Sequence, residues 1–324
     1  MAQSDMVVFN QYMQPAIIET LSQMVEKFNG ASRNAIRLTT QGFSGDYLQE
    51  SFWAGIHSAQ RRVDRYATNG TATTTDLSQL QHNSVKVAGG FGPIRFEPAQ
   101  LTWLQKPTAE GIEVISRNVA EAMMKDMLNS AIAALVGAIE AQATAKYDSG
   151  TGPLTYRDLN NAHALFGDHS QNIVCNVVTG ETFHGFIDAN LANAERLFVS
   201  QGVLVVDVLG RAVVITDAAA LDEGAVTGGD IKALGLVTDA AVVHDAGDMV
   251  TNIETSNGLE RIVTTFQADY TFGLGLKGYA WDTTNGGKSP TDAEIATGSN
   301  WDKVATSIKH TAGVIALADA SDAI

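Results

Sequence analysis

Apolar residues recur at steps of three and four along residues 108–147, the longest periodic stretch of the chain. This spacing places them on one face of an α-helix, and the stretch contains no proline. Such a helix would be about 55–60 Å long, whereas the mean helix has only ~11–12 residues. A strict heptad with flanking opposite charges is absent, so we predict a spine that crosses a domain and not a coiled coil. The recurring residues are Ile112, Ile115, Val119, Met123, Met127, Ala131, Leu135 and Ile139.

A second helical pattern lies near the amino terminus. Pro15 is suited to the first turn of a helix, and Gly30 is suited to its end. We therefore expect an amphipathic helix of about a dozen residues between them, with Ile17, Leu21 and Phe28 on its apolar face. This arm has no core of its own and must lie on something else.

The region between the two helices reads differently. Residues 52–66 predict a short helix, and residues 67–75 are polar with little to bury. Two alternating segments follow, 84–88 and 93–98, with glycines between them, which predicts a β-hairpin. Its sides are charged, so we expect it to project from the subunit. The charged residues concerned are Lys86, Arg95 and Glu97.

The second half alternates helix and strand, which predicts an α+β fold without a repeat of 20–50 residues. We expect helices from Thr155 to Leu165 and from Thr179 to about Phe198, and a strand over 172–178. A hairpin is expected over 202–217. Residues 261–280 are rich in β-branched and aromatic side chains and predict long strands, and a small helical piece is expected over 301–308.

The composition fits a protein whose surface is largely covered by something, for example by copies of itself. Hydrophobic residues make up 45% of the 324, and charged residues only 18%, below the ~25% usual in soluble domains. The net charge of −15 is uneven: residues 1–150 carry 12 basic and 14 acidic side chains, and residues 151–324 carry 9 and 22. A nucleic-acid reader needs a basic stripe, so that class is excluded for the acidic half. The one basic cluster comprises Arg61, Arg62 and Arg65, which we interpret as solvated or subunit-facing.

The sequence contains partial matches to motifs of enzymes, but none of them meets the full requirements of its motif. Gly273–Gly278 matches G-x-G-x-x-G, but a strand pattern and not a helix follows it, so no dinucleotide site is expected. Gly287-Lys288-Ser289 lacks the first P-loop glycine. The single cysteine, Cys175, lies in an apolar strand-like run and is expected to be a buried, inert thiol.

The sequence also gives no indication of a metal site, a membrane-spanning segment or a secretory signal. His163 and His169, like the segment 244–248, are interpreted as surface or turn residues and not as metal ligands. No secretory signal is visible, and no uninterrupted apolar run approaches ~18 residues. We expect no enzyme activity, no cofactor, no metal and no membrane contact.

Four segments of the chain resemble parts of the major capsid proteins of tailed bacteriophages, the Hong Kong 97-type fold. Residues 208–217 are similar to the family's Leu-Gly-x-Pro-Val hairpin, with Ala212 where proline is usual. Residues 260–280 resemble the long late strand of the peripheral domain. The segment 84–98 with Trp103, and the tail 281–303, are similar to capsid proteins of a short-tailed phage group.

The resemblance implies a structural protein that forms pentamers and hexamers of an icosahedral head around double-stranded DNA, in the virion after assembly in the host cytoplasm. It implies separate scaffolding, cement or decoration, and portal proteins, and DNA contact without sequence specificity. The subunit-interface candidates are Arg61, Arg62, Arg65, Lys86, Arg95 and Glu97. The expected order is an arm (1–40), an extended loop region (41–106), the spine helix of the peripheral domain (107–153), an axial domain (154–252), return strands of the peripheral domain (253–285) and a tail (286–324).

Rival interpretations remain open at the level of sequence. An encapsulin-like or other self-assembling shell protein, or a tail-tube protein, would differ in symmetry and cargo. An acidic soluble enzyme using Gly273–Gly278 would be small and monodisperse, whereas a capsid protein would form capsomers or shells.

Overall fold

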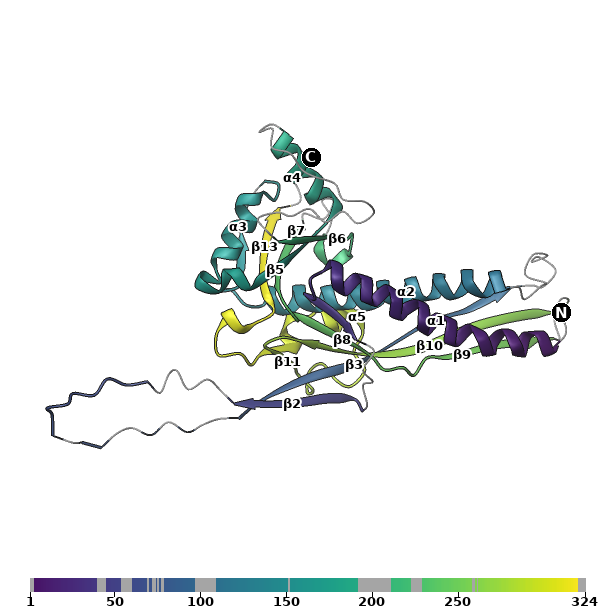
Figure 1. Ribbon diagram of the computed structural model, residues 1–324, viewed down its shortest axis with the longest axis horizontal. Helices are drawn as coiled ribbons and strands as arrows, with labels where there is room; N and C mark the ends of the chain where they lie inside the picture. Colours follow the sequence, from purple (N-terminus) through teal and green to yellow (C-terminus); the bar gives the residue numbers. More distant parts are fainter. Residues whose placement is uncertain are drawn as a thin grey trace.

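A computed structural model describes residues 3–39, 45–53, 60–68, 70–71, 74, 76, 79–96, 109–150, 152–191, 211–222, 229–257, 260 and 262–319. Two sheets and two long helices form the subunit (Figure 1). The helices are α1 (Gln3–Ala31), α2 (Ala109–Glu140), α3 (Tyr156–Ala164), α4 (Gly180–Leu191) and α5 (Asp292–Ala296). Short 3₁₀ turns cover Gly167–Asn172, Ala219–Leu221, Gly298–Asn300 and Ile308–His310.

The larger sheet has eight strands, with β10 at its centre. One edge of β10 pairs with β3, and the other edge pairs with β9 and then with β8. Its strands are β1 (Ile36–Thr39), β2 (Tyr47–Trp53), β3 (Gln79–Phe96), β8 (Ala241–Asp245), β9 (Val250–Ser256), β10 (Val263–Leu276), β11 (Tyr279–Trp281) and β12 (Trp301–Lys303).

The smaller sheet has five strands in the order β4-β13-β7-β5-β6. The C-terminal strand β13 therefore lies inside this sheet, whereas β8 and β9 lie in the larger one, so the sheets divide the chain differently from the predicted domain ranges. Its strands are β4 (Lys146–Asp148), β5 (Ile173–Val178), β6 (Ala212–Ile215), β7 (Asp230–Val237) and β13 (Gly313–Asp319).

The predicted long helix is confirmed as α2, which has 32 residues and is about 48 Å long. It ends at Glu140, so residues 141–147 of the predicted stretch lie outside the helix. Its segment Ser116–Glu140 is long and apolar enough to cross a membrane, but most of it is buried inside the subunit. The buried face includes Met123, Met127 and Leu135. The apolar side chains of this segment are therefore mostly covered by packing inside the subunit.

Three local predictions were wrong. The first helix begins at Gln3, so Pro15 lies inside it and not in its first turn; the helix continues past this exposed proline although the proline removes one backbone hydrogen bond. The expected helix over 52–66 does not form in the part of this range that the structure describes: Phe52 and Trp53 belong to β2, and residues 60–66 form no regular element, while residues 54–59 lie outside the described residues. Residues 301–303 form the strand β12 and not a helix.

The expected hairpin over 84–98 is one continuous strand of 18 residues, β3. Its glycines make room for neighbours and do not form a turn. A Cβ on Gly89 would lie 2.7 Å from the ring of Tyr270, and Gly92 has φ +99° where the register with β10 shifts between Phe266 and Ala268. A bulge, which bends a strand, therefore replaces the predicted turn.

Helix α2 approaches the C-terminal part of the chain so closely that two glycines are required. A Cβ on Gly298 would overlap the carbonyl oxygen of Gly137 and lie 2.7 Å from the Cβ of Ala141. Nearby, Lys232 of β7 is buried and donates to Glu140 Oε2 at 2.7 Å, which joins the end of α2 to the smaller sheet.

We expect Gly298→Ala to lower the free energy of unfolding by ~1–3 kcal/mol, because overpacking forces backbone shifts. Urea unfolding followed by circular dichroism measures the change. Gly185→Ala is the matched control, since Gly185 lies inside α4 with nothing within 4 Å of an added Cβ; it should stabilise by ~0.5–1 kcal/mol. Equal effects of the two substitutions would contradict the close approach.

Candidate subunit-interface surfaces

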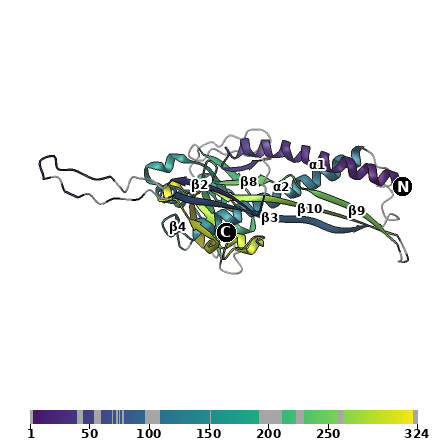
Figure 2. The same ribbon diagram turned by 90° about the horizontal axis from the view of Figure 1, so that it is seen from below.

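A segment that follows β2 lies far from the packed core. Residues 60–68 are all exposed and form no regular secondary structure. Val63 and Tyr66 are 67% and 92% exposed, which is high for apolar and aromatic side chains. Figures 1 and 2 both show this part of the chain at the left end, beyond β2, whereas α1 lies to the right. We call residues 60–68 the tip segment.

The tip segment carries the predicted basic cluster. Arg61, Arg62 and Arg65 all lie in it, with Asp64 as its only acidic residue. The Asp64 carboxylate accepts the Tyr66 backbone N–H at 2.9 Å, and the Arg65 guanidinium lies 5.9 Å from the Tyr66 ring centroid. These are local contacts that shape the segment and leave its surface exposed.

The other predicted interface residues occupy different places. Lys86 lies on β3 and donates to Asp248 Oδ2 at 3.1 Å, within the same subunit. Asp248 also accepts from the Thr271 hydroxyl and backbone N–H, so it ties β3 and β10 to the connection before β9. Arg95 is exposed on β3 opposite Thr265. Glu97 lies outside the described residues.

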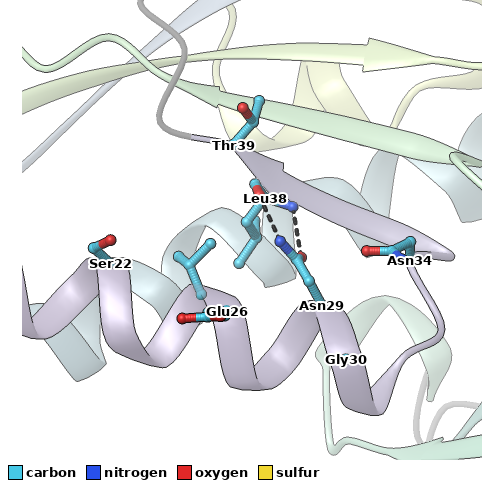
Figure 3. A pocket seen from close by; sticks show the side chains of 8 residues that line it. Ser22, Glu26, Asn29, Gly30, Asn34, Leu38 and Thr39 are labelled. Carbon is cyan, nitrogen blue, oxygen red and sulfur yellow. Dashed lines mark hydrogen bonds between the residues drawn. The ribbon is translucent and has the colours of Figure 1, made fainter.

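Sequence reasoning missed a groove between α1 and β1 (Figure 3). Its volume is about 440 Å³, and buried Val25 and Leu38 form its apolar part. The Asn29 side chain donates to the Leu38 carbonyl at 2.7 Å and accepts from the Leu38 N–H at 3.0 Å, which fixes β1 against the helix. Glu26 is exposed at the rim. No sequence signal marks the groove, because it forms only where α1 and β1 meet.

The smaller sheet contains a buried polar network that the sequence did not indicate. His163 is 2% exposed, so its interpretation as a surface or turn residue was wrong. Arg211 can only donate, so the 2.6 Å contact makes His163 Nδ1 the acceptor. The ring proton is then on Nε2, which donates to Asn176 Oδ1 at 2.9 Å. Burial, with the Arg211 charge adding to it, lowers the pKa of His163 to about 4.

Acid should therefore destabilise the smaller sheet through His163. Its pKa is about 4 when folded and ordinarily 6.5, so the stability is complete above pH 6.5 and is lost as pH falls toward 4. The loss should reach ~3 kcal/mol. Thermal melts of the unmodified chain and His163→Gln between pH 7 and 4.5 test this, with the half-buried His169→Gln as control. The decline should be shallower only in His163→Gln, and parallel declines in all three would contradict the assignment.

Residues considered for chemistry occupy structural positions. Cys175 is buried in β5, and burial raises the pKa of its thiol to about 12, so it is an inert thiol as predicted. Gly273–Gly278 runs from β10 through a turn toward β11, and no helix follows it. Within the described ranges no group of three or more metal-ligating side chains gathers.

The subunit thus combines a long helix, a sheet built around the long strand β10 and a second, smaller sheet. The Cyanophage Pam1 capsid asymmetric unit is similar at TM-score 0.53 and 12% identity, over 88% of each chain. A structure of Microbacterium phage Oxtober96 is similar at TM-score 0.52 and 12% identity, covering 89% of this chain and 91% of that one. At these identities the likeness shows the fold, the Hong Kong 97-type fold expected from the sequence.

The chain belongs to the major capsid protein 13-like family, whose profile matches residues 5–315. No curated protein matches it. It is a structural protein of the phage head, located in the virion capsid, and the sequence-based identification as a tailed-phage major capsid protein is confirmed.

Proposed function

We propose that copies of this chain form pentamers and hexamers of an icosahedral phage head that encloses double-stranded DNA. The observation that carries the proposal is the tip segment, a run of exposed residues with three arginines and a 92%-exposed tyrosine held away from the core. Exposed aromatic and arginine side chains are typical anchors of protein interfaces. A neighbouring subunit would bury them in the shell.

We further propose that the two sheets correspond to two capsid domains. The larger sheet, with α1 and α2, would be the peripheral domain, and the smaller sheet with α3 and α4 would be the axial domain. The predicted extended loop region (41–106) contributes β2 and β3 to the larger sheet, and the predicted arm (1–40) contributes β1, while its helix α1 packs against α2, β1 and β9. The arm and loop would therefore be anchored in the peripheral domain of their own subunit.

The proposed role is non-enzymatic and needs no cofactor. Scaffolding, cement or decoration, and portal proteins would be separate chains that meet the shell during assembly in the host cytoplasm. DNA contact would be weak, because the net charge of −15 opposes tight binding to phosphates, and it would lack sequence specificity. An acidic inner surface of the shell would enclose the genome without binding it tightly.

Negative-stain electron microscopy of the expressed full chain, with analytical ultracentrifugation, tests the proposal. We expect capsomers or closed shells. Interfaces per subunit should exceed the ~1,200–2,000 Å² of a standard complex. A compact 34.3 kDa monomer under every condition, absent from particles, would contradict it.

A further inference from the structure

The strand β13 completes the smaller sheet, although every other strand of both sheets precedes it in the chain. It lies between β4 and β7, and Figure 1 shows it in yellow among the teal and green strands of that sheet. Its seven residues pair with β7, and three of them also pair with β4. Both neighbours of β13 are therefore synthesised before it.

The residues of β13 are buried on both sides of the sheet. Val314, Ile315, Ala316 and Leu317 have no exposed surface. Because successive side chains of a strand point to opposite faces, both faces of β13 are covered. The helices α2 and α3 pack against it. A chain without β13 in place would therefore expose apolar core residues to water.

Backbone contacts show how closely β13 fits between its neighbours. A Cβ on Gly313 would overlap the carbonyl oxygen of Gly235, so the backbones of β13 and β7 touch at these glycines. On the other edge, the Ser149 N–H and hydroxyl both donate to the Leu317 carbonyl oxygen at 3.0 Å. The strand β13 thus joins β7 to the chain that follows β4.

Without β13 the smaller sheet consists of two separate parts. Within the described ranges β4 has no other strand partner, and β5 is the only strand left beside β7. The N–H and C=O groups of β7 that face β13 would lose their partners, and burying unpaired backbone groups costs free energy. This part of the subunit therefore cannot close before β13 arrives.

The direction of synthesis separates the two sheets in time. A chain leaves the ribosome from its amino terminus, and its domains fold in that order. The last strand of the larger sheet, β12, ends at Lys303, so this sheet can pair while β13 is still inside the ribosome. The smaller sheet has to wait for β13.

We propose that insertion of β13 between β4 and β7 is the last step of subunit folding, and that a copy joins its neighbours only after this step. The second half rests on the proposed function as a capsid subunit. Neighbours bind a preorganised surface with less loss of conformational entropy, and the smaller sheet, one of the two proposed capsid domains, is ordered only by β13. Copies whose β13 is still inside a ribosome are thereby kept out of a growing shell.

Limited trypsin digestion of ribosome-bound chains tests the order of folding. The full chain is followed after Ile324 by a Gly-Ser linker, either short enough to keep β13 inside the exit tunnel or long enough to place it outside. Mass spectrometry reads cleavage at Lys232, buried in β7 opposite Leu317, and at Lys86, in β3 beside β10. We expect cleavage after Lys232 alone with the short linker, and after neither lysine with the long one.

Two variants with the long linker are the matched controls. Leu317→Asp places a carboxylate at a buried position of β13, so it should restore cleavage after Lys232 while Lys86 stays protected. Lys303→Asp places the same side chain on exposed β12 and should leave both lysines protected. With the short linker, protection of Lys232 would show that the smaller sheet closes without β13, and cleavage after both lysines would show that the two sheets fold together. Either result would overturn the proposed order.

Capture of free subunits tests the link to assembly. The ribosome-bound chains are mixed with labelled free copies of the unmodified chain and sedimented. The long-linker chain and its Lys303→Asp variant should capture label, whereas the short-linker chain and the long-linker Leu317→Asp variant should not. Equal capture by all four, or by none while free copies form particles, would overturn the control of assembly by β13. Absence of particles from the free unmodified chain would instead count against the proposed function.

Discussion

Replacing residues 60–76 by a short Gly-Ser linker should leave the subunit folded and abolish closed shells. The described residues of this stretch are exposed and outside both sheets, so the core loses little packing. Loop length changes closure entropy only weakly, at about 0.6 kcal/mol per doubling. Circular dichroism melting should therefore be nearly unchanged, while electron microscopy should show no closed particles.

The control replaces residues 85–92 with the same linker. Most of these residues pair with β10, from Ala268 to Leu274, and Val85 and Val87 are buried. This variant should fail to fold, because it removes a strand next to the centre of the larger sheet. Normal shells from the 60–76 variant, or loss of its folded state, would contradict the assignment of residues 60–68 as an intersubunit segment.

Leu128→Pro should give insoluble protein. Leu128 lies in the middle of α2 and packs against the core, and proline there removes a backbone hydrogen bond and clashes with the preceding turn. Interrupting the helix lowers the free energy of unfolding by ~3 kcal/mol or more, and the loss of side-chain packing lowers it further. Domains of this kind are stable by only ~5–15 kcal/mol.

Solubility after expression and a circular dichroism spectrum check the result. Lys125→Ala, an exposed position one turn earlier, is the control and should stay soluble with normal assembly. A soluble, assembly-competent Leu128→Pro protein would show that α2 does not depend on continuity at this point.

The long helix and the long strand could be predicted from the sequence, because the geometry of each element sets the spacing of its apolar residues. The apolar steps of α2 survive as its buried face, including Met123, Met127 and Leu135. The β-branched and aromatic run near residue 270 became β10, the most extensively paired strand of the larger sheet. The apolar setting of Cys175 likewise predicted its burial in β5.

Short segments depended on partners distant in sequence, and there local patterns misled. Gly89 and Gly92 have the composition of a turn, but both lie inside the strand β3, where Gly89 makes room for Tyr270 and Gly92 lies in a bulge of β3 opposite β10. His163 gives no sign of burial along the chain, and only the approach of Arg211 and Asn176 gives its ring two polar partners.

The candidate interface divides in the same way. The three arginines of the tip segment were visible as residue types, because a basic cluster in an acidic chain stands out. Their exposed position beyond β2 was decided by pairing of β2 with β3, which fixes where the intervening chain leaves the sheet. The groove between α1 and β1 was decided entirely by tertiary structure, since Glu26 and Leu38 meet only when α1 packs on β1. Sequence determined which helices and strands could form, whereas long-range pairing determined which surfaces the subunit offers to its neighbours.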